Sequence, residues 1–188
     1  DLNCVISPGN IIAAGEDGLV IISTNNGTNF TTALPPGTNS PDYYALAYAP
    51  NSSFLAFGEN GSVIKSTNSG LNWSHVQGLT GTGSGIEEIY FPSPLVGYAV
   101  CGTEYLLSTS NGGVNWSSQV MINTYYMNSL HFVNTLTGFA GGNNGPIFDG
   151  SAAIIEKTTN GGVNWINTSI PGTINISSIS FADINYGW

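Results

Sequence analysis

Ser66-Thr67-Asn68-Ser69-Gly70-Leu71-Asn72-Trp73 is one of four eight-residue segments that align without gaps along the 188-residue chain. The other three are Ser23-Thr24-Asn25-Asn26-Gly27-Thr28-Asn29-Phe30, Thr109-Ser110-Asn111-Gly112-Gly113-Val114-Asn115-Trp116 and Thr158-Thr159-Asn160-Gly161-Gly162-Val163-Asn164-Trp165. They share the pattern Ser/Thr-x-Asn-x-Gly-x-Asn-Trp/Phe, and their starts lie 43, 43 and 49 residues apart. Asn and Gly suit a tight turn, because both tolerate unusual backbone angles. Each segment, called a box from here on, therefore indicates one turn of a repeated unit.

A second landmark recurs in step with the boxes. An aromatic residue, a polar turn and a Gly-aromatic pair follow one another at 91–99, 132–140 and 181–188, with a degenerate copy that starts at Tyr48. Between the landmarks, short apolar and β-branched runs alternate with Gly-containing turns, and no stretch has a helical period. Each unit of about 43 residues thus predicts four short antiparallel strands, which is the size of one β-propeller blade.

We therefore expect an all-β chain of β-propeller blades, each of four antiparallel strands. Residues 1–188 form one domain in this interpretation, with repeats at approximately 1–43, 44–86, 87–127 and 128–176 and a partial fifth at 177–188. Because the sequence stops inside the second strand of a fifth unit, a segment of a larger propeller is favoured. A closed four-bladed disk and an open stack whose edge a neighbour completes are the alternatives.

The boxes resemble the Asp-box, or BNR, repeat, whose usual form is Ser-x-Asp-x-Gly-x-Thr-Trp. The two-landmark unit looks most like the repeats of photosystem II assembly-factor-like and sortilin-type propellers, and the resemblance spans essentially the whole chain. The chain departs from the pattern in one consistent way, because the box Asp is Asn in all four copies, at Asn25, Asn68, Asn111 and Asn160. The resemblance implies that each box is a structural turn between the third and fourth strands of a blade, at the rim.

The charge of the chain excludes several functions. The chain has eleven carboxylate side chains and two cationic ones, Lys65 and Lys157, which give a formal net charge of −9, and it has no arginine. Nucleic-acid binding needs Lys and Arg that displace counterions, so no nucleic acid is expected as a partner. No apolar run approaches the roughly 20 residues that span a bilayer, so no membrane insertion is expected.

The sequence also argues against catalysis. Asp-box sialidases hold the substrate carboxylate with three arginines, so that activity cannot reside in this segment. Asp-box endoglucanases use a carboxylate pair, and such enzymes need two carboxyls at a defined separation. Glu87 and Glu88 are adjacent candidates, but neighbouring residues of a strand point to opposite faces of the sheet. We expect a protein without catalytic residues, and the alternative is a glycoside hydrolase whose carboxylates lie partly outside this segment. The candidates are Asp17, Asp42, Glu87, Glu88, Asp149 and Glu156.

No metal or cofactor is expected either. His75 and His131 are isolated, and no Cys or His spacing is typical of a metal site. Cys4 and Cys101 lie in different repeats at different repeat positions. Two small buried apolar residues are therefore favoured over a disulfide.

The box aromatic residues have two interpretations. Phe30, Trp73, Trp116 and Trp165 could each stack on a sugar, or each could cap the core of its blade as a large apolar anchor. Their identical position in the repeat favours the anchor, because a site is seldom repeated in every unit of a scaffold.

Glycosylation is expected at the surface of the blades. Three of the eight Asn-x-Ser/Thr sequons share one box position, at Asn29, Asn72 and Asn115. Their place beside the box aromatic predicts that they face solvent, where an extracellular protein can be N-glycosylated.

Together these features predict a non-catalytic scaffold of a secreted or cell-surface protein, with a structural or adhesive role. Its expected partners are glycans or proteins, bound by loops that vary between units at 35–41, 81–85 and 143–151. Self-association into a surface layer or filament through an open strand edge is a variant of this hypothesis. A photosystem-assembly role ranks last, because the chain has no basic patch.

Overall fold

The structure of the chain is a computed structural model. It describes residues 1–7, 9–33, 41–49, 53–76, 79, 85–102, 105–121, 126–143, 145, 152–170 and 175–187. In this part of the chain, sixteen strands form four antiparallel sheets of four strands each. The helical residues described are two 3-10 turns, η1 (Glu16–Gly18) and η2 (Glu59–Gly61), and no described helix has the length and apolar character of a membrane span. The prediction of an all-β chain with four-stranded blades is confirmed.

The strands of each sheet follow one another in chain order, so that each sheet is one blade. Blade 1 consists of β1 (Leu2–Ile6), β2 (Ile11–Gly15), β3 (Val20–Ser23) and β4 (Thr31–Thr32). Blade 2 consists of β5 (Tyr43–Ala49), β6 (Ser53–Gly58), β7 (Val63–Ser66) and β8 (Ser74–His75). Blade 3 consists of β9 (Ile86–Tyr90), β10 (Gly97–Cys101), β11 (Tyr105–Thr109) and β12 (Ser117–Val120). Blade 4 consists of β13 (Tyr126–Phe132), β14 (Gly138–Asn143), β15 (Ala153–Thr158) and β16 (Ile166–Ile170).

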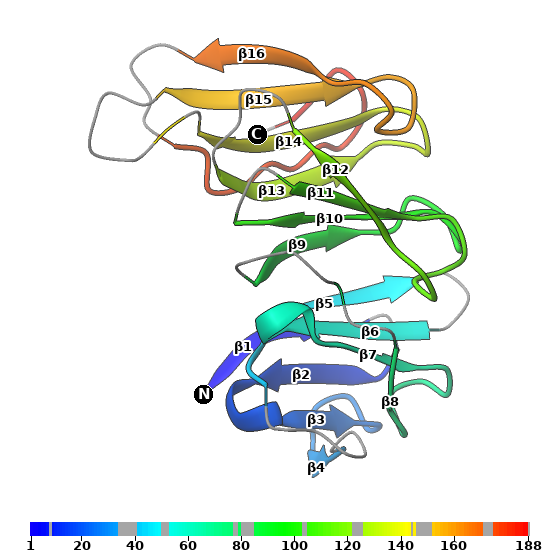
Figure 1. Cartoon of the computed structure of the whole chain (residues 1–188). Helices are drawn as coiled ribbons and strands as arrows, with labels where there is room; N and C mark the ends of the chain where they lie inside the picture. The colour runs from blue at the N-terminus through cyan, green and yellow to red at the C-terminus, as the bar shows by residue number, and fades with distance from the viewer. Residues whose placement is uncertain are drawn as a thin grey trace.

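The blades are arranged around their first strands. β1 packs against β5, β5 against β9, and β9 against β13. In Figure 1 the first two blades extend toward the bottom of the view and the last two toward the top, which leaves β4 and β16 at opposite extremes. β6, β10 and β14 are buried along their whole length, whereas β4, β8 and β12 are exposed. The second strands of blades 2, 3 and 4 are covered on both faces, which explains their runs of small and apolar residues.

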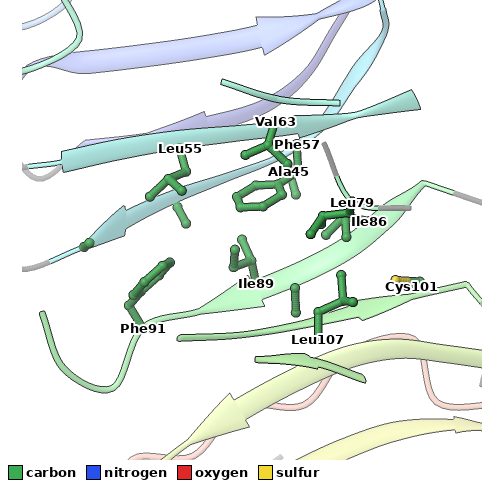
Figure 2. Close-up of a cluster of buried hydrophobic side chains, with 13 residues drawn as sticks. Ala45, Leu55, Phe57, Val63, Leu79, Ile86, Ile89, Phe91, Cys101 and Leu107 are labelled. Atoms are coloured by element: carbon green, nitrogen blue, oxygen red, sulfur yellow. The ribbon is translucent and has the colours of Figure 1, made fainter. Parts of the chain in front are cut away.

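The core consists of the layers between consecutive blades. Figure 2 shows the layer between blades 2 and 3, where Leu55 and Phe57 of β6 meet Ile89 of β9. Cys101 lies in the same layer with no exposed surface and as a free thiol, and Cys4 is also free. The expectation of a buried apolar cysteine is therefore confirmed for Cys101, whereas Cys4 is only partly buried.

The second landmark is a contact between a glycine and an aromatic ring across a hairpin. A Cβ on Gly97 would lie 2.5 Å from the ring of Phe91, so only glycine fits beside that ring. The same relationship recurs in the partial fifth unit, where Phe181 pairs with Gly187. Phe181 also stacks on Phe139 of β14 with ring centroids 4.0 Å apart, so the fifth unit covers part of the free face of blade 4.

Candidate functional site: the box turns and the blade junctions

Each box is a turn between the third and fourth strands of its blade, closed by its own side chains. In blade 2 the Ser66 hydroxyl donates to Asn68 Oδ1 at 3.0 Å and accepts from the Gly70 backbone N–H at 2.9 Å. The Asn72 backbone N–H donates to the same Asn68 Oδ1 at 2.9 Å. The other three boxes repeat these bonds at 2.9 to 3.1 Å. The Asn side chain thus supplies one oxygen that accepts twice, which explains how it replaces Asp without loss of the turn.

The box glycine lies against the preceding blade. The box glycines of blades 2, 3 and 4, each of which has a blade before it, have φ values between +78° and +86°. L residues rarely adopt such values. A Cβ on each would also approach the second strand of the preceding blade. The pairs and distances are Gly70 with Ile12 (2.3 Å), Gly113 with Leu55 (2.5 Å) and Gly162 with Tyr98 (3.0 Å). Gly27 of blade 1 has a similar φ of +82°, but its Cβ would meet only Ile11 of its own blade at 3.4 Å.

A hydrogen bond from the preceding blade reaches the residue before each of these glycines. Three different side chains donate to the backbone carbonyl at the fourth box position. The bonds run from Asn10 Nδ2 to Ser69 (2.9 Å), from Lys65 Nζ to Gly112 (2.7 Å) and from the Tyr98 hydroxyl to Gly161 (2.8 Å). The boxes are therefore joints between blades as well as turns within them. The sequence did not reveal these joints, because donors as unlike as Asn, Lys and Tyr share no motif.

The box aromatic residues lie between blades. Trp73 is buried against the preceding blade, Trp116 packs edge-on to Phe57 of the preceding blade with centroids 5.7 Å apart, and Trp165 is half-buried. Each indole N–H donates to the carbonyl of its own box glycine at 2.9 to 3.2 Å. The anchor interpretation is wrong for Phe30, which is 45% exposed. The reason is positional, because none of the described residues forms a blade in front of blade 1.

Among the carboxylates proposed as catalytic candidates, the structure brings Asp17 and Asp42 together, and Glu88 lies apart from them between two blades. Glu88 Oε2 accepts from the Ser129 hydroxyl and from the Leu130 backbone N–H, both at 2.6 Å, and so ties blade 3 to blade 4. Asp42 Oδ1 accepts from the backbone N–H of Asp17 at 2.9 Å, at the opposite end of the sheets from the boxes. Asp149 lies outside the described residues.

Burial affects the titration of two other candidates, Glu156 and Glu87. Burial raises the pKa of Glu156, and the hydrogen bond from Asn167 partly offsets that rise. Burial also raises the pKa of Glu87. The two lie in different blades, Glu156 on β15 and Glu87 on β9. Among the described residues no group of three or more His, Cys, Asp or Glu side chains could hold a metal ion.

The end of the sheets that carries the box turns, called the box face, displays aliphatic side chains in a repeated position. Backbone bonds from Gly112 to Leu95 and from Gly161 to Leu136, both 2.8 Å, join the box of a blade to the turn of its first hairpin. Both turns therefore lie on the box face, to the right in Figure 1. The exposed aliphatics of this face, between 46% and 65% exposed, are Leu71, Leu95, Val114, Leu136, Val163 and Ile184.

The acidic side chains of the described turns gather at the opposite end, whereas both lysines, Lys65 and Lys157, directly precede a box. Glu16, Asp17, Asp42 and Glu59 lie in or beside the turns η1 and η2, to the left in Figure 1. Asp183, in the fifth unit, is the described carboxylate in a turn of the box face. The two ends of the blades thus differ, one rich in carboxylates and the other apolar with few carboxylates.

The remaining surface predictions divide between described and undescribed residues. Asn29, Asn72 and Asn115 are exposed, as a glycosylation site requires, and their modification stays a prediction. The variable loops expected to bind ligands lie largely outside the described residues, at 35–40, 81–84, 144 and 146–151.

Four-stranded antiparallel blades, packed face to face around their first strands, define the class of this protein as a β-propeller. It is similar to YCF48 from Cyanidioschyzon merolae, with a TM-score of 0.68, 16% identity, and coverage of 93% of this chain and 57% of that one. It is also similar to YCF48 bound to D1 peptide (TM-score 0.58, 20% identity, 74% and 47% covered). A third similar structure is an ancestral GH74 enzyme (TM-score 0.71, 18% identity, 89% and 25% covered).

These similarities establish the fold. The sequence itself matches no family model and no curated protein. The chain spans about half of the length of the YCF48 structures and a quarter of the GH74 enzyme. Propellers of this architecture therefore include an enzyme and a peptide-bound protein, and function has to be argued from the surfaces of this chain.

Proposed function

We propose that this chain belongs to a non-catalytic, extracellular β-propeller that binds a protein partner on its box face. The observation that carries the proposal is the repeated exposure of aliphatic side chains at the box and hairpin turns. Exposed apolar side chains grouped on one face are typical of interaction surfaces. The similar structure of YCF48 in complex with a peptide supports a binding role for this architecture.

The charge of the chain suggests the chemistry of the partner. A net charge of −9 attracts a basic partner over a distance, and the box face, which is poor in carboxylates, lets apolar side chains dock without desolvating them. We therefore favour a peptide segment that carries Lys or Arg together with apolar side chains. A glycan is the second partner class, for which a separate site is argued in the next subsection.

A scaffold is favoured over an enzyme by what the boxes and the carboxylates do. The features that recur in every box, from Ser66 to Trp73 and its equivalents, close the turn and form contacts between blades. Glu88 is engaged in two hydrogen bonds between blades. The similarity to a GH74 enzyme keeps a glycoside hydrolase as the competing function.

The extracellular setting rests on composition and on surface position. The chain has two lysines and no arginine, so an exposed protein of this kind offers trypsin-like proteases few sites. The box sequons at Asn29, Asn72 and Asn115 are exposed. Expression in a glycosylating eukaryotic host, followed by mass spectrometry, tests this setting: glycans at these three residues support it, and bare asparagines contradict it.

Selection from a random-peptide phage library tests the binding face. We expect enriched peptides to carry basic and apolar residues and to lose binding to a triple variant, Leu95→Ser, Leu136→Ser and Val163→Ser. The matched control is Leu2→Ser, which removes an equally exposed aliphatic (50%) from blade 1. Peptides that bind the triple variant as well as the wild type, or turnover of β-glucans by the purified chain, would contradict the proposal.

A further inference from the structure

One buried position in blade 4 breaks the pattern of the other three blades. In every blade an alanine of the second strand lies opposite the third-strand residue two positions before the box. That third-strand residue is aliphatic in the first three blades and is Glu156 in blade 4. The paired positions are Ala13–Ile21, Ala56–Ile64, Ala99–Leu107 and Ala140–Glu156. A carboxyl has therefore replaced an apolar side chain in the layer between two blades.

Glu156 is deeply placed, with 2% of its surface exposed. Its neighbour in the fourth strand, Asn167, donates from Nδ2 to Glu156 Oε1 at 3.2 Å. The corresponding residues of the other blades are shorter or of a different kind, Thr32, His75 and Ser118. Glu156 and Asn167 thus form a polar pair that is specific to blade 4.

This pair is unfavourable for folding. Burial of a carboxyl removes it from water, and one hydrogen bond does not replace its hydration. Leu107 shows that an aliphatic side chain fills the same position at the preceding junction. Departures from a local rule without a structural gain tend to mark functional sites.

A cleft of about 260 Å³ lies directly beside the pair, between the outer strand of blade 3 and the box and outer strand of blade 4. Gln119 Nε2 donates to the Val163 carbonyl at 3.3 Å across this gap. The residues that line the cleft are Gln119, Val120, Met121, Glu156, Val163, Asn164, Trp165 and Asn167. Its walls therefore combine one carboxyl, three carboxamides, an indole and aliphatic groups.

We propose that this cleft binds one residue of a neutral carbohydrate. Glu156 and Asn167 hydrogen-bond neighbouring hydroxyl groups of the sugar, and the Trp165 side chain contacts its ring. A sugar hydroxyl both donates and accepts, so it suits carboxylates and carboxamides together, and its C–H groups suit an aromatic or aliphatic wall. The cleft has room for one pyranose ring.

Other ligand chemistries fit the lining less well. No cationic side chain lines the cleft, so an anion has no counter-charge there. Glu156 is its only carboxylate, and hard divalent cations need several charged or carbonyl oxygens. A primary amine would use Glu156 but would accept nothing from the remaining N–H groups of the wall carboxamides, because an ammonium group only donates.

Titration of the 15N-labelled chain, produced in a non-glycosylating host because Asn167 lies in a sequon, tests the site. The probes are the methyl glycosides of glucose, galactose, mannose and N-acetylglucosamine. We expect one of them to shift the side-chain amide signals of Asn167 and Gln119 with a Kd on the order of 1 mM, as suits so small a ligand. Butylamine serves as the amine probe and should leave those signals unchanged.

Glu156→Leu restores the residue type of the other blades and is expected to fold at least as well as the wild type. It should weaken glycoside binding at least tenfold, whereas the matched control Glu87→Leu, on the first strand of blade 3, should leave binding intact. Equal binding to Glu156→Leu, no shift with any glycoside, or shifts with butylamine alone would overturn the proposal. The cleft adjoins the box face at Val163, but Leu95 and Leu136 of the box face lie outside the cleft lining, so peptide binding at those residues is tested independently of either outcome.

Discussion

The Tyr98 hydroxyl donates a 2.8 Å hydrogen bond to the carbonyl of Gly161, which lies 63 residues further along the chain in the box of the next blade. The same ring stacks on Phe132 of the next blade with centroids 4.0 Å apart. Gly162 also lies against this ring, because a Cβ on it would be 3.0 Å from Tyr98 Cε1. One side chain therefore holds two blades together by both packing and polar contact.

Tyr98→Phe separates these two contributions, because it removes the hydroxyl and keeps the ring. We expect the free energy of unfolding to fall by about 1–2 kcal/mol, since the Gly161 carbonyl loses its donor in a partly buried place. Urea unfolding followed by tryptophan fluorescence measures the change. Tyr48→Phe is the control, with an expected change within about 0.5 kcal/mol, and an equal loss in both variants would refute the role of the Tyr98 bond.

The box glycines offer an internal comparison between a turn and a joint. Gly27 and Gly70 have φ values of +82° and +86°, so alanine strains the backbone about equally at both. Only at Gly70 does the new Cβ collide with the preceding blade, 2.3 Å from Ile12 Cδ1. We expect Gly27→Ala to cost about 1 kcal/mol and Gly70→Ala about 1–3 kcal/mol more, as in overpacked cores. Thermal unfolding of the two variants decides, and equal losses would show that the box acts within its own blade alone.

The fold could be predicted because its cause is local and repeated. The boxes and the Phe-to-Gly hairpins recur in one period, and each prescribes a turn at a fixed place between short strands. What surrounds a box could not be predicted in the same way. The packing of Gly113 on Leu55 depends on side chains about 58 residues apart, and no periodicity within a unit reports it. The exposure of Phe30 has the same origin, since it depends on what packs against blade 1.

A serine on the first strand of blade 4 connects three successive repeats. The Ser129 hydroxyl donates to Glu88 in blade 3 at 2.6 Å and accepts from the Ile179 backbone N–H of the fifth unit at 2.8 Å. Ser129→Ala removes one of the two donors to Glu88 and leaves the Ile179 N–H without its acceptor, in a place where Ser129 itself is 1% exposed. We expect a loss of about 1–3 kcal/mol in unfolding free energy and faster hydrogen exchange at the Ile179 amide.

Hydrogen exchange at the Ile179 amide, measured by NMR, distinguishes loss of the Ser129 contact from a general loss of stability. Ser108→Ala removes a surface hydroxyl that pairs with Ser117 at 3.1 Å and should leave exchange at Ile179 unchanged. If exchange at Ile179 is equally protected in wild type and Ser129→Ala, the fifth unit is held in place by other contacts, such as the stacking of Phe181 on Phe139.

The pairing of Glu156 with Asn167 could not be predicted from the sequence. Glu156 was one of six carboxylates that the sequence offered without any ranking, and Asn167 was one of eight sequons. Register across blade 4 brings them together and shows that the equivalent positions in three blades are aliphatic. Glu156, like Leu107, lies two positions before its box, so their equivalence can be read from the aligned boxes, whereas the burial of Glu156 and its pairing with Asn167 cannot.

The raised pKa of Glu156 makes stability depend on pH in a defined direction. Burial is the main cause of the rise above the ordinary value of 4.5, and the Asn167 hydrogen bond opposes it. The folded state then binds the proton more tightly than the unfolded state, so the contribution of Glu156 to stability is fully present below about pH 4.5 and is lost as pH rises through the folded pKa. Glu156→Gln stays neutral, so its unfolding free energy relative to wild type should increase between about pH 4 and pH 7. Asn167→Ser removes the group that lowers this pKa and should extend the decline of stability to higher pH. Urea unfolding at several pH values measures all three proteins, and a constant difference between wild type and Glu156→Gln would mean that the Glu156 carboxyl is hydrated in the folded protein.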